Sequence, residues 1–303
     1  MNPRLLIIHR ARWGGAEKTL LDWIEGLNRN GWPLTVAAPE GRFLERVKAW
    51  DIPVEPVDFA AWRKPRDYFR NRSYKQRISN LAASTNANLI IAGDFRTAPF
   101  AVAAAKNNRI PCLAMVQDGT IQRRHVRAYR LHRANLVVCP SYPLLHRIRH
   151  GGVDRERSIL LPVGIDTKRS HPASEGSAFR EEWKISYDAI LIGCVGSISH
   201  LKGQDLLLEA AAPLLERNPC LQIVFVGTGQ EEFVNELKNQ YPSYSENGRI
   251  RFAGWREDIP SVLAAFDIVV VPSRAESFSR ATAEAMSVGK PVIATQTGAV
   301  EEL

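Results

Sequence analysis

Two glutamates near the end of the chain, Glu276 and Glu284, bracket the start of a predicted helix. The first follows a strand-like apolar run, and the second lies inside the helix. Carboxylates accept hydrogen bonds from hydroxyl groups, and the backbone N–H groups of Ser277, Phe278 and Ser279 would point at an anion. A ligand that carries several hydroxyl groups and a phosphate fits both features. The alternative is a solvated first turn, in which the helix dipole favours acidic residues.

A lysine and a pair of glycines add candidate phosphate contacts. Lys202 lies just before a predicted helix in the second half of the chain, where its charge and position suit a phosphate group. Gly14 and Gly15 lie between the first predicted strand and the first predicted helix, where glycine lets the backbone approach a ligand closely. Taken singly, a surface lysine and a tight turn are the simpler interpretations.

Short apolar runs that alternate with amphipathic stretches must position these residues. Unbroken apolar runs are typical of strands covered on both faces, and hence of a mostly parallel sheet. Strands are predicted at 5–9, 34–38, 54–57, 89–92, 112–116, 136–139, 189–195, 221–226, 250–253, 268–271 and 291–294. Helices are predicted at 15–30, 74–84, 99–107, 203–216, 231–239, 259–265 and 281–288. The alternation of predicted strands and helices is interrupted by a segment rich in Pro, Gly and Ser (160–177). We therefore predict two doubly wound, Rossmann-like α/β domains, at 1–168 and 169–303.

Together these segments resemble the retaining glycosyltransferases of family 4, which have the two-domain GT-B fold. The E-x7-E region of that family is matched by Glu276-Ser277-Phe278, Glu284-Ala285-Met286 and Gly289-Lys290-Pro291-Val292. The resemblance implies that Glu276 contacts the hydroxyl groups of the donor sugar and that Glu284 contacts the ribose of its nucleotide. It also implies that Lys202, in the segment 194–203, grips the diphosphate.

The resemblance extends over essentially the whole chain. Further matching segments are Gly14-Gly15-Ala16-Glu17, Pro162-Val163-Gly164-Ile165-Asp166, Val226-Gly227-Thr228-Gly229 and Phe252-Ala253-Gly254-Trp255. They imply that Gly14 and Gly15 close over the donor phosphates and that Gly227 and Trp255 lie near the nucleotide.

The chain departs from the family pattern at four places, the first of which is Val163, where the family's hinge has Asn. Ser197 stands beside the expected phosphate position where the family commonly has Arg, so one positive charge is missing. Gln117 and Asp118 occupy the region where many members have a His near the reaction centre, and we expect them on the acceptor side. The chain also stops soon after its last predicted strand, so we expect the second domain to lack the closing elements of the family.

The resemblance implies transfer of a hexose from a nucleotide sugar to a hydroxyl group of a lipid-linked or cell-surface glycan, as in polysaccharide or lipopolysaccharide synthesis. The anomeric configuration would be retained. Glu276 and Lys202 would be the catalytic residues, the first positioning the sugar and the second stabilising the leaving diphosphate. No cofactor and no metal are expected, since the sequence has no DxD-like cluster. The alternative is a non-catalytic protein of the same fold that binds a nucleotide sugar or an anionic membrane.

Charge is divided unevenly, with a net +15 in residues 1–169 and a net −7 in residues 170–303. Basic residues mixed with aromatic ones at 62–77 and 123–133 suit an anionic membrane surface, to which each Lys or Arg contributes about 1 kcal/mol. A solvated basic face is the main alternative, and single-stranded nucleic acid is the least favoured partner. No apolar run is long enough to span a membrane and no signal peptide is evident, so we expect a cytoplasmic protein, free or attached to the inner face of the membrane.

Two other kinds of chemistry are disfavoured by the sequence. The four cysteines form no CxxC pair, so we expect buried, reduced thiols rather than a zinc or redox site. A dinucleotide-dependent oxidoreductase needs a G-x-G-x-x-G turn followed by an acid. Neither the turn at 13–15 nor the turn at 196–197 has that pattern, so we exclude this class of enzyme.

Overall fold

The computed structural model of the chain describes residues 2–10, 14–59 and 71–303. It divides into two compact units, Met1–Val163 and Gly164–Leu303, which are described separately below. The division falls inside the segment rich in Pro, Gly and Ser, five residues before the predicted boundary. Among the described residues, no helix is both long enough and apolar enough to cross a membrane.

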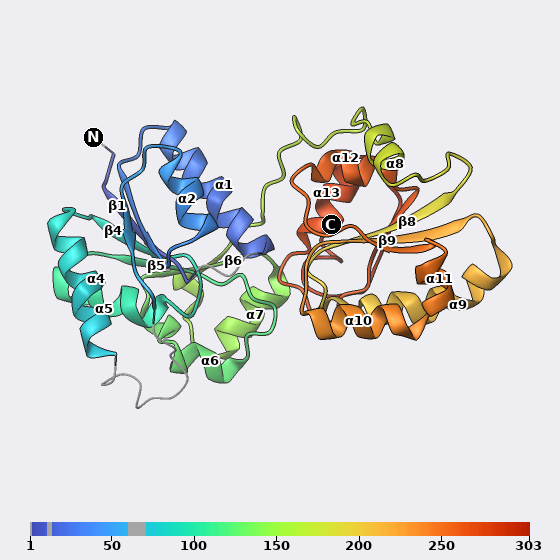
Figure 1. Cartoon of the computed structure of the whole chain (residues 1–303). Coiled ribbons are helices and arrows are strands. Elements are labelled where there is room, and N and C mark those ends of the chain that lie inside the picture. The colour runs from blue at the N-terminus through green and yellow to red at the C-terminus, as the bar shows by residue number, and fades with distance from the viewer. Residues whose placement is uncertain (1, 11–13, 60–70) are drawn as a thin grey trace. The chain divides into compact units, whose positions relative to one another are not determined.

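The first unit is built on a parallel sheet of seven strands (Figure 1). Across the sheet the strands are β3 (Val54–Pro56), β2 (Leu34–Ala38), β1 (Leu5–Ile8), β4 (Leu89–Ala92), β5 (Cys112–Met115), β6 (Leu136–Cys139) and β7 (Ser158–Leu160). The strand order turns back between β1 and β4, which makes their carboxyl ends the expected ligand position of such a sheet. The six predicted strands are present with ends that agree to within one residue. The seventh, β7, was not predicted; it runs directly into the segment rich in Pro, Gly and Ser.

Helices cover both faces of this sheet. They are α1 (Gly15–Arg29), α2 (Arg42–Lys48), α4 (Arg72–Ser84), α5 (Ala98–Asn108), α6 (Arg123–Ala128) and α7 (Tyr142–His150). Alternate residues of β1 show the arrangement, since Leu5 and Ile7 pack in the core beneath α1 and α2 while Leu6 and Ile8 pack in the core on the opposite face. Burial on both faces explains why the strand is an unbroken apolar run.

The second unit repeats the plan with five parallel strands. Across its sheet they are β10 (Ile250–Phe252), β9 (Leu221–Val226), β8 (Ile190–Val195), β11 (Ile268–Val271) and β12 (Val292–Ala294). Its helices are α8 (Ser177–Glu182), α9 (Gln204–Arg217), α10 (Glu231–Gln240), α11 (Pro242–Glu246), α12 (Ile259–Ala265) and α13 (Arg280–Ser287). The order turns back between β8 and β11. The predicted pair of Rossmann-like α/β domains is therefore confirmed.

Two glycines of the chain differ in the space around them. A Cβ built on Gly193, in β8, would lie 2.0 Å from the ring of Phe266, so the core is closed over this position. A Cβ on Gly26, in α1, would meet nothing within 4 Å.

We predict that Gly193→Ala lowers the free energy of unfolding by about 1–3 kcal/mol, because a methyl group would overpack a closed core. Gly26→Ala, the matched control, should raise it by about 0.5–1 kcal/mol, because alanine loses less backbone entropy in a helix. Urea unfolding of both variants measures the difference. Equal effects of the two substitutions would contradict the close packing of β8 against Phe266.

Candidate active site

Three loops of the second unit meet at the carboxyl edge of its sheet. The loop after β8 contacts the loop after β9 so closely that a Cβ on Gly227 would lie 2.0 Å from the carbonyl oxygen of Gly196. It also contacts the loop after β11, because Arg274 donates its backbone N–H to the carbonyl of Leu201 at 2.8 Å. The loops that carry most of the predicted donor-site residues are thus held together where the strand order turns back.

The central feature of this edge is an ion pair between Lys202 and Glu276. Lys202 Nζ lies 2.6 Å from Glu276 Oε1, and the hydroxyl of Ser273 donates to the same oxygen at 2.7 Å. The side chain of Glu276 is 9% exposed and that of Lys202 is 27% exposed. A carboxylate this deeply buried needs charge and hydrogen-bond partners, and the lysine and serine supply them. The interpretation of Lys202 as an ordinary surface lysine is therefore wrong.

Gly298 fixes the backbone of Glu276 from the other side. Its φ of +61° is in the left-handed region, and a Cβ there would lie 2.8 Å from the Cβ of Glu276. Sequence reasoning missed both Ser273 and Gly298 as parts of the site. Ser273 was weakly indicated by the sequence, because a polar residue that closely follows a buried parallel strand is a candidate site residue. Gly298 was not indicated by any feature of the sequence.

Glu284 lies within α13 and is also buried, with 8% of its side chain exposed. Its Oε1 accepts a hydrogen bond from Nε of Arg280, one turn earlier, at 2.9 Å. The alternative of a solvated helix start is therefore wrong for both glutamates. The small residue Ala285 packs in the core.

The segment between the two glutamates turns sharply into α13. Ser279 adopts a left-handed conformation with φ 75°, and its hydroxyl lies 2.7 Å from that of Thr282. Phe278 and Ser279 are buried, whereas Ser277 is half-buried. The helix begins at Arg280, one residue before the predicted start.

Ser197, Gly227 and Trp255 lie on loops of the same edge. Ser197 is exposed, and its carbonyl accepts a hydrogen bond from the side chain of Gln204 at 3.0 Å. Gly227 donates its N–H to the carbonyl of Gly254 at 2.7 Å, which ties the loop after β9 to the loop that carries the half-buried Trp255. The structure therefore brings these residues to the edge that holds Lys202 and Glu276.

In the first unit, a buried cluster of one histidine and two acids lies at the end of β1. Gly14 precedes α1 directly, Gly15 is its first residue, and Glu17 lies in its first turn. His9 Nε2 is 3.7 Å from Glu17 Oε1, and His9 Nδ1 is 3.3 Å from Asp94 Oδ2. Asp94 closely follows β4, the strand next to β1. Sequence reasoning did not single out His9 or Asp94, although a polar residue closely following a buried parallel strand is a usable signal.

Electrostatics makes this cluster a charged one. Burial by itself would lower the pKa of His9, but the neighbouring carboxylates of Asp94 and Glu17 outweigh it and raise the pKa to about 9. Burial would raise the pKa of Asp94, but His9 and the backbone N–H groups of Arg10 and Arg96 hold it below its ordinary value. The histidine is therefore an imidazolium at neutral pH.

We predict that the stability of the first unit falls as the pH rises from about 6.5 to about 9. The folded-state pKa of His9 is raised, so its contribution is complete below the unfolded value of 6.5 and is lost as the pH passes about 9. The loss is at most about 3 kcal/mol. Unfolding at a series of pH values measures it; His9→Gln should flatten the profile in this window, and substitution of the exposed His146 should not. An unchanged slope in His9→Gln would refute a charged His9.

Gln117 and Asp118, the predicted acceptor-side residues, follow β5 in the first unit. Asp118 accepts hydrogen bonds from Arg96 Nη2 at 2.8 Å and from the backbone N–H of Thr120 at 2.9 Å. Burial would raise the pKa of Asp118, but these donors and the Thr120 hydroxyl hold it below its ordinary value. Gln117 is half-buried, with Nε2 3.8 Å from the sulfur of Met115.

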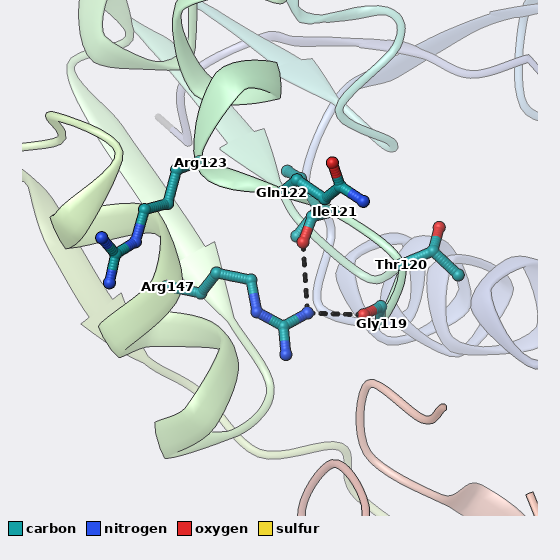
Figure 2. A pocket seen from close by; sticks show the side chains of 6 residues that line it. All are labelled: Gly119, Thr120, Ile121, Gln122, Arg123 and Arg147. Atoms are coloured by element: carbon teal, nitrogen blue, oxygen red, sulfur yellow. Dashed lines mark hydrogen bonds between the residues drawn. The ribbon is translucent and has the colours of Figure 1, made fainter. Parts of the chain in front are cut away.

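A cavity of about 500 Å³ lies beside the loop that directly follows Asp118 (Figure 2). It is lined by Gly119, Thr120, Ile121, Gln122, Arg123 and Arg147. Arg147, on α7, donates through Nη1 to the carbonyls of Gly119 at 2.6 Å and Ile121 at 3.1 Å. No feature of the sequence had singled out Arg147.

The two predicted basic segments differ in the structure. Residues 62–70 of the first segment lie outside the described residues. In its described part, Arg72 is exposed, Lys75 is buried and Arg77 pairs with Glu55 at 2.6 Å. In the second segment, the exposed arginines are Arg123, Arg124, Arg127 and Arg133. Exposed positive charge within the described part of these segments is therefore concentrated in 123–133.

The cysteines and the potential metal ligands of the described residues add little chemistry. Burial raises the pKa of the thiols of Cys112, Cys139 and Cys194 to about 12, which makes them poor nucleophiles, whereas Cys220 is exposed. Within residues 2–10, 14–59 and 71–303, no three His, Cys, Asp or Glu side chains are grouped so that they would hold a metal ion.

Comparison with known sequences gives matches over both units. Residues 13–169 match the family described as Glycosyltransferase Family 4, and residues 189–303 match Glycosyl transferases group 1. Among curated relatives, the lipopolysaccharide core biosynthesis mannosyltransferase LpsB of Rhizobium meliloti is 35% identical over 63% of this chain and 54% of its own length. The GDP-mannose-dependent alpha-mannosyltransferase of Corynebacterium glutamicum is 26% identical over 94% of this chain and 69% of its own length. The chain spans about half the length, or less, of the curated relatives that it matches most strongly.

Solved structures show the same architecture. The Anabaena protein Alr3699/HepE in complex with UDP-glucose superimposes with a TM-score of 0.85 at 25% identity, covering 99% of this chain and 82% of that one. WaaG, a glycosyltransferase involved in lipopolysaccharide biosynthesis, superimposes with a TM-score of 0.72 at 18% identity, covering 98% of this chain and 83% of that one, and supports the fold alone.

Proposed function

We propose, from the premise that this chain belongs to glycosyltransferase family 4, that it transfers a hexose from a nucleotide sugar to a hydroxyl group of a lipid-linked or cell-surface glycan. The observation that carries the proposal is the ion pair of the half-buried Lys202 with the nearly buried carboxylate of Glu276, which lies where the strand order of the second sheet turns back. A cation and a carboxylate at this position match a ligand with a diphosphate and a polyhydroxyl group. A related structure points the same way, since the HepE protein was solved with UDP-glucose.

In the proposed reaction, the bond from the anomeric carbon to the diphosphate breaks and a bond to the acceptor oxygen forms on the same face. The acceptor proton passes to an oxygen of the leaving phosphate, which balances the charge. Lys202 stabilises the negative charge that develops on the diphosphate, and Glu276 orients the sugar through its hydroxyl groups. Their pairing at 2.6 Å holds both side chains in place before the donor arrives. No metal takes part in this proposal.

The remaining predicted residues take supporting roles in the proposal. Glu284, held by Arg280, accepts hydrogen bonds from the ribose. The close-packed turn at Gly227 and the half-buried Trp255 line the nucleotide. The backbone groups of Ser197 and of the segment 277–279 face the phosphates. In the first unit, Gly14 and Gly15 supply a backbone surface without side chains, and Gln117 and Asp118 contact the acceptor.

The test is an assay of transfer or donor hydrolysis with a panel of nucleotide sugars, after a thermal-shift screen has found which of them bind. We predict that Lys202→Ala and Glu276→Gln each lower the turnover number about 100-fold or more, because each removes a preorganised contact to the reacting groups. Glu182→Gln, the matched control, removes a carboxylate that pairs with Arg256 on the exterior of the same unit and should leave turnover unchanged. Activity should persist in EDTA.

The results separate the proposal from its main alternative. Binding of a nucleotide sugar without turnover would overturn the enzyme and leave a non-catalytic binding protein of the same fold. Turnover that survives Lys202→Ala and Glu276→Gln would move the reaction away from this edge of the second sheet.

We further propose that the protein works in the cytoplasm, at an anionic membrane surface that it contacts through residues 123–133. The four exposed arginines of this segment support it, since each contributes about 1 kcal/mol near such a surface. A lipid-linked acceptor would be found at the same place.

We expect the full chain to pellet with vesicles that contain phosphatidylglycerol but not with vesicles of phosphatidylcholine alone, and salt should release it. Arg124→Gln combined with Arg133→Gln should weaken pelleting by roughly 30-fold, on the same estimate of about 1 kcal/mol for each charge. A single-stranded oligonucleotide provides the comparison. Tighter binding to the oligonucleotide than to the vesicles would favour nucleic acid, and binding to neither would favour a solvated basic face.

A further inference from the structure

We propose that the cavity after β5 in the first unit binds a phosphate group carried by the acceptor. This inference rests on the proposed function and specifies the chemistry of the acceptor. Its basis is a cavity of about 500 Å³ that is lined by two guanidinium groups and by no acidic side chain (Figure 2).

The position of the cavity in the fold favours a ligand site. It is lined by the loop that leaves the carboxyl end of β5 and by Arg147 of α7. Ligands of doubly wound sheets bind at the carboxyl ends of the strands. A second cavity of about 510 Å³ in the same unit lies at the opposite edge, beside Leu5 and Leu34, the first residues of β1 and β2. Volume does not distinguish the two cavities, but position and charge do.

The charge of the first cavity is positive. Within the described residues, neither Arg123 nor Arg147 is paired with a carboxylate. The acidic residue closest in sequence to the cavity lining is Asp118. Its carboxylate is paired with Arg96 at 2.8 Å and accepts hydrogen bonds from Thr120. An anion in the cavity would therefore meet two cations without meeting an unpaired carboxylate.

The geometry of Arg147 suits a fixed anion contact. One terminal nitrogen, Nη1, is held by the carbonyls of Gly119 and Ile121, and Figure 2 shows the other terminal nitrogen directed away from these two carbonyls. The side chain is thus oriented before a ligand binds, which lowers the entropic cost of the contact. A guanidinium presents paired N–H groups that match the oxygens of a phosphate, and the open cavity suits a group that is attached to a larger acceptor.

The first test is calorimetric titration of the full chain with inorganic phosphate in a Lys202→Ala background, which removes the phosphate contact expected in the other unit. Arg123→Gln should weaken phosphate binding about tenfold, as expected for loss of one charge-assisted hydrogen bond. Arg124→Gln is the matched control, because it removes the same charge from the next residue of α6, outside the cavity lining. It should change the affinity less than about twofold, since an exposed charge is screened.

Two results would overturn the inference: no phosphate binding, or equal losses in Arg123→Gln and Arg124→Gln, which would indicate a diffuse basic surface. Arg147→Gln provides a second variant, and its thermal melting shows whether the loop still folds; if it does not fold, Arg123→Gln decides. Phosphate binding requires no glycosyl transfer, so this test can fail while transfer is observed, or succeed while transfer is not.

Two further ligands identify the source of the phosphate group. Glucose 6-phosphate represents a soluble phosphorylated sugar, and phosphatidylcholine vesicles with phosphatidic acid represent a lipid phosphate. Binding of either one supports the site and indicates its source if inorganic phosphate displaces it more than chloride at the same ionic strength and if Arg123→Gln weakens it more than Arg124→Gln. Binding of both that is indifferent to Arg123→Gln counts against it.

Discussion

The second unit depends on one buried carboxylate that must be compensated. Glu276 is removed from water by the loop that carries it and by Gly298, and an unpaired carboxylate in such a position would be costly. Lys202 and Ser273 compensate it, and they come from the loops after β8 and β11. The pair therefore joins the two loops that flank the turn-back point of the sheet. Breaking this ion pair would leave an uncompensated buried charge. It would also remove the contact that holds the loops after β8 and β11 together.

The first unit uses the same solution at the corresponding place. His9 closely follows β1, and Asp94 closely follows β4, the two strands between which the order turns back. Their nitrogen and oxygen atoms lie 3.3 Å apart, with Glu17 of α1 completing the cluster. Each unit thus pairs a cation with a carboxylate where the strand order of its own sheet turns back; His9 is buried, whereas Lys202 is half-buried. The fold explains the repetition, because strand ends diverge there and polar groups can enter without disturbing the apolar layers.

Most of the fold was predictable because buried parallel strands are unbroken apolar runs. The strands 34–38, 89–92 and 221–226 were predicted with the boundaries observed. Elements such as β7 (Ser158–Leu160) and α6 (Arg123–Ala128) were not predicted. The first runs into the segment rich in Pro, Gly and Ser, and the second is a basic stretch in which Val126 alone is buried, so it has no apolar periodicity.

The site was predictable where residue type and motif agreed. Residue type and motif singled out Glu276, Glu284 and Lys202. They did not single out Ser273 and Arg280, which donate hydrogen bonds to the two glutamates. Arg280 is four residues from Glu284 on the helix, a spacing that is also common on exposed helix surfaces. Contacts such as that of Gly298 with Glu276 join residues 22 positions apart, and only the folded chain shows them.

The glycine at position 227 has a consequence for how the loops after β8 and β9 can move. With 2.0 Å between its expected Cβ position and the carbonyl of Gly196, the loops after β8 and β9 interlock backbone to backbone. Ile198 and Gly229 add a β-bridge between the same two loops. Loops joined in this way move as one body, so a ligand that binds there orders few new degrees of freedom. Selectivity at this edge then comes from a rigid shape that rejects misfits, rather than from a loop that adapts to them.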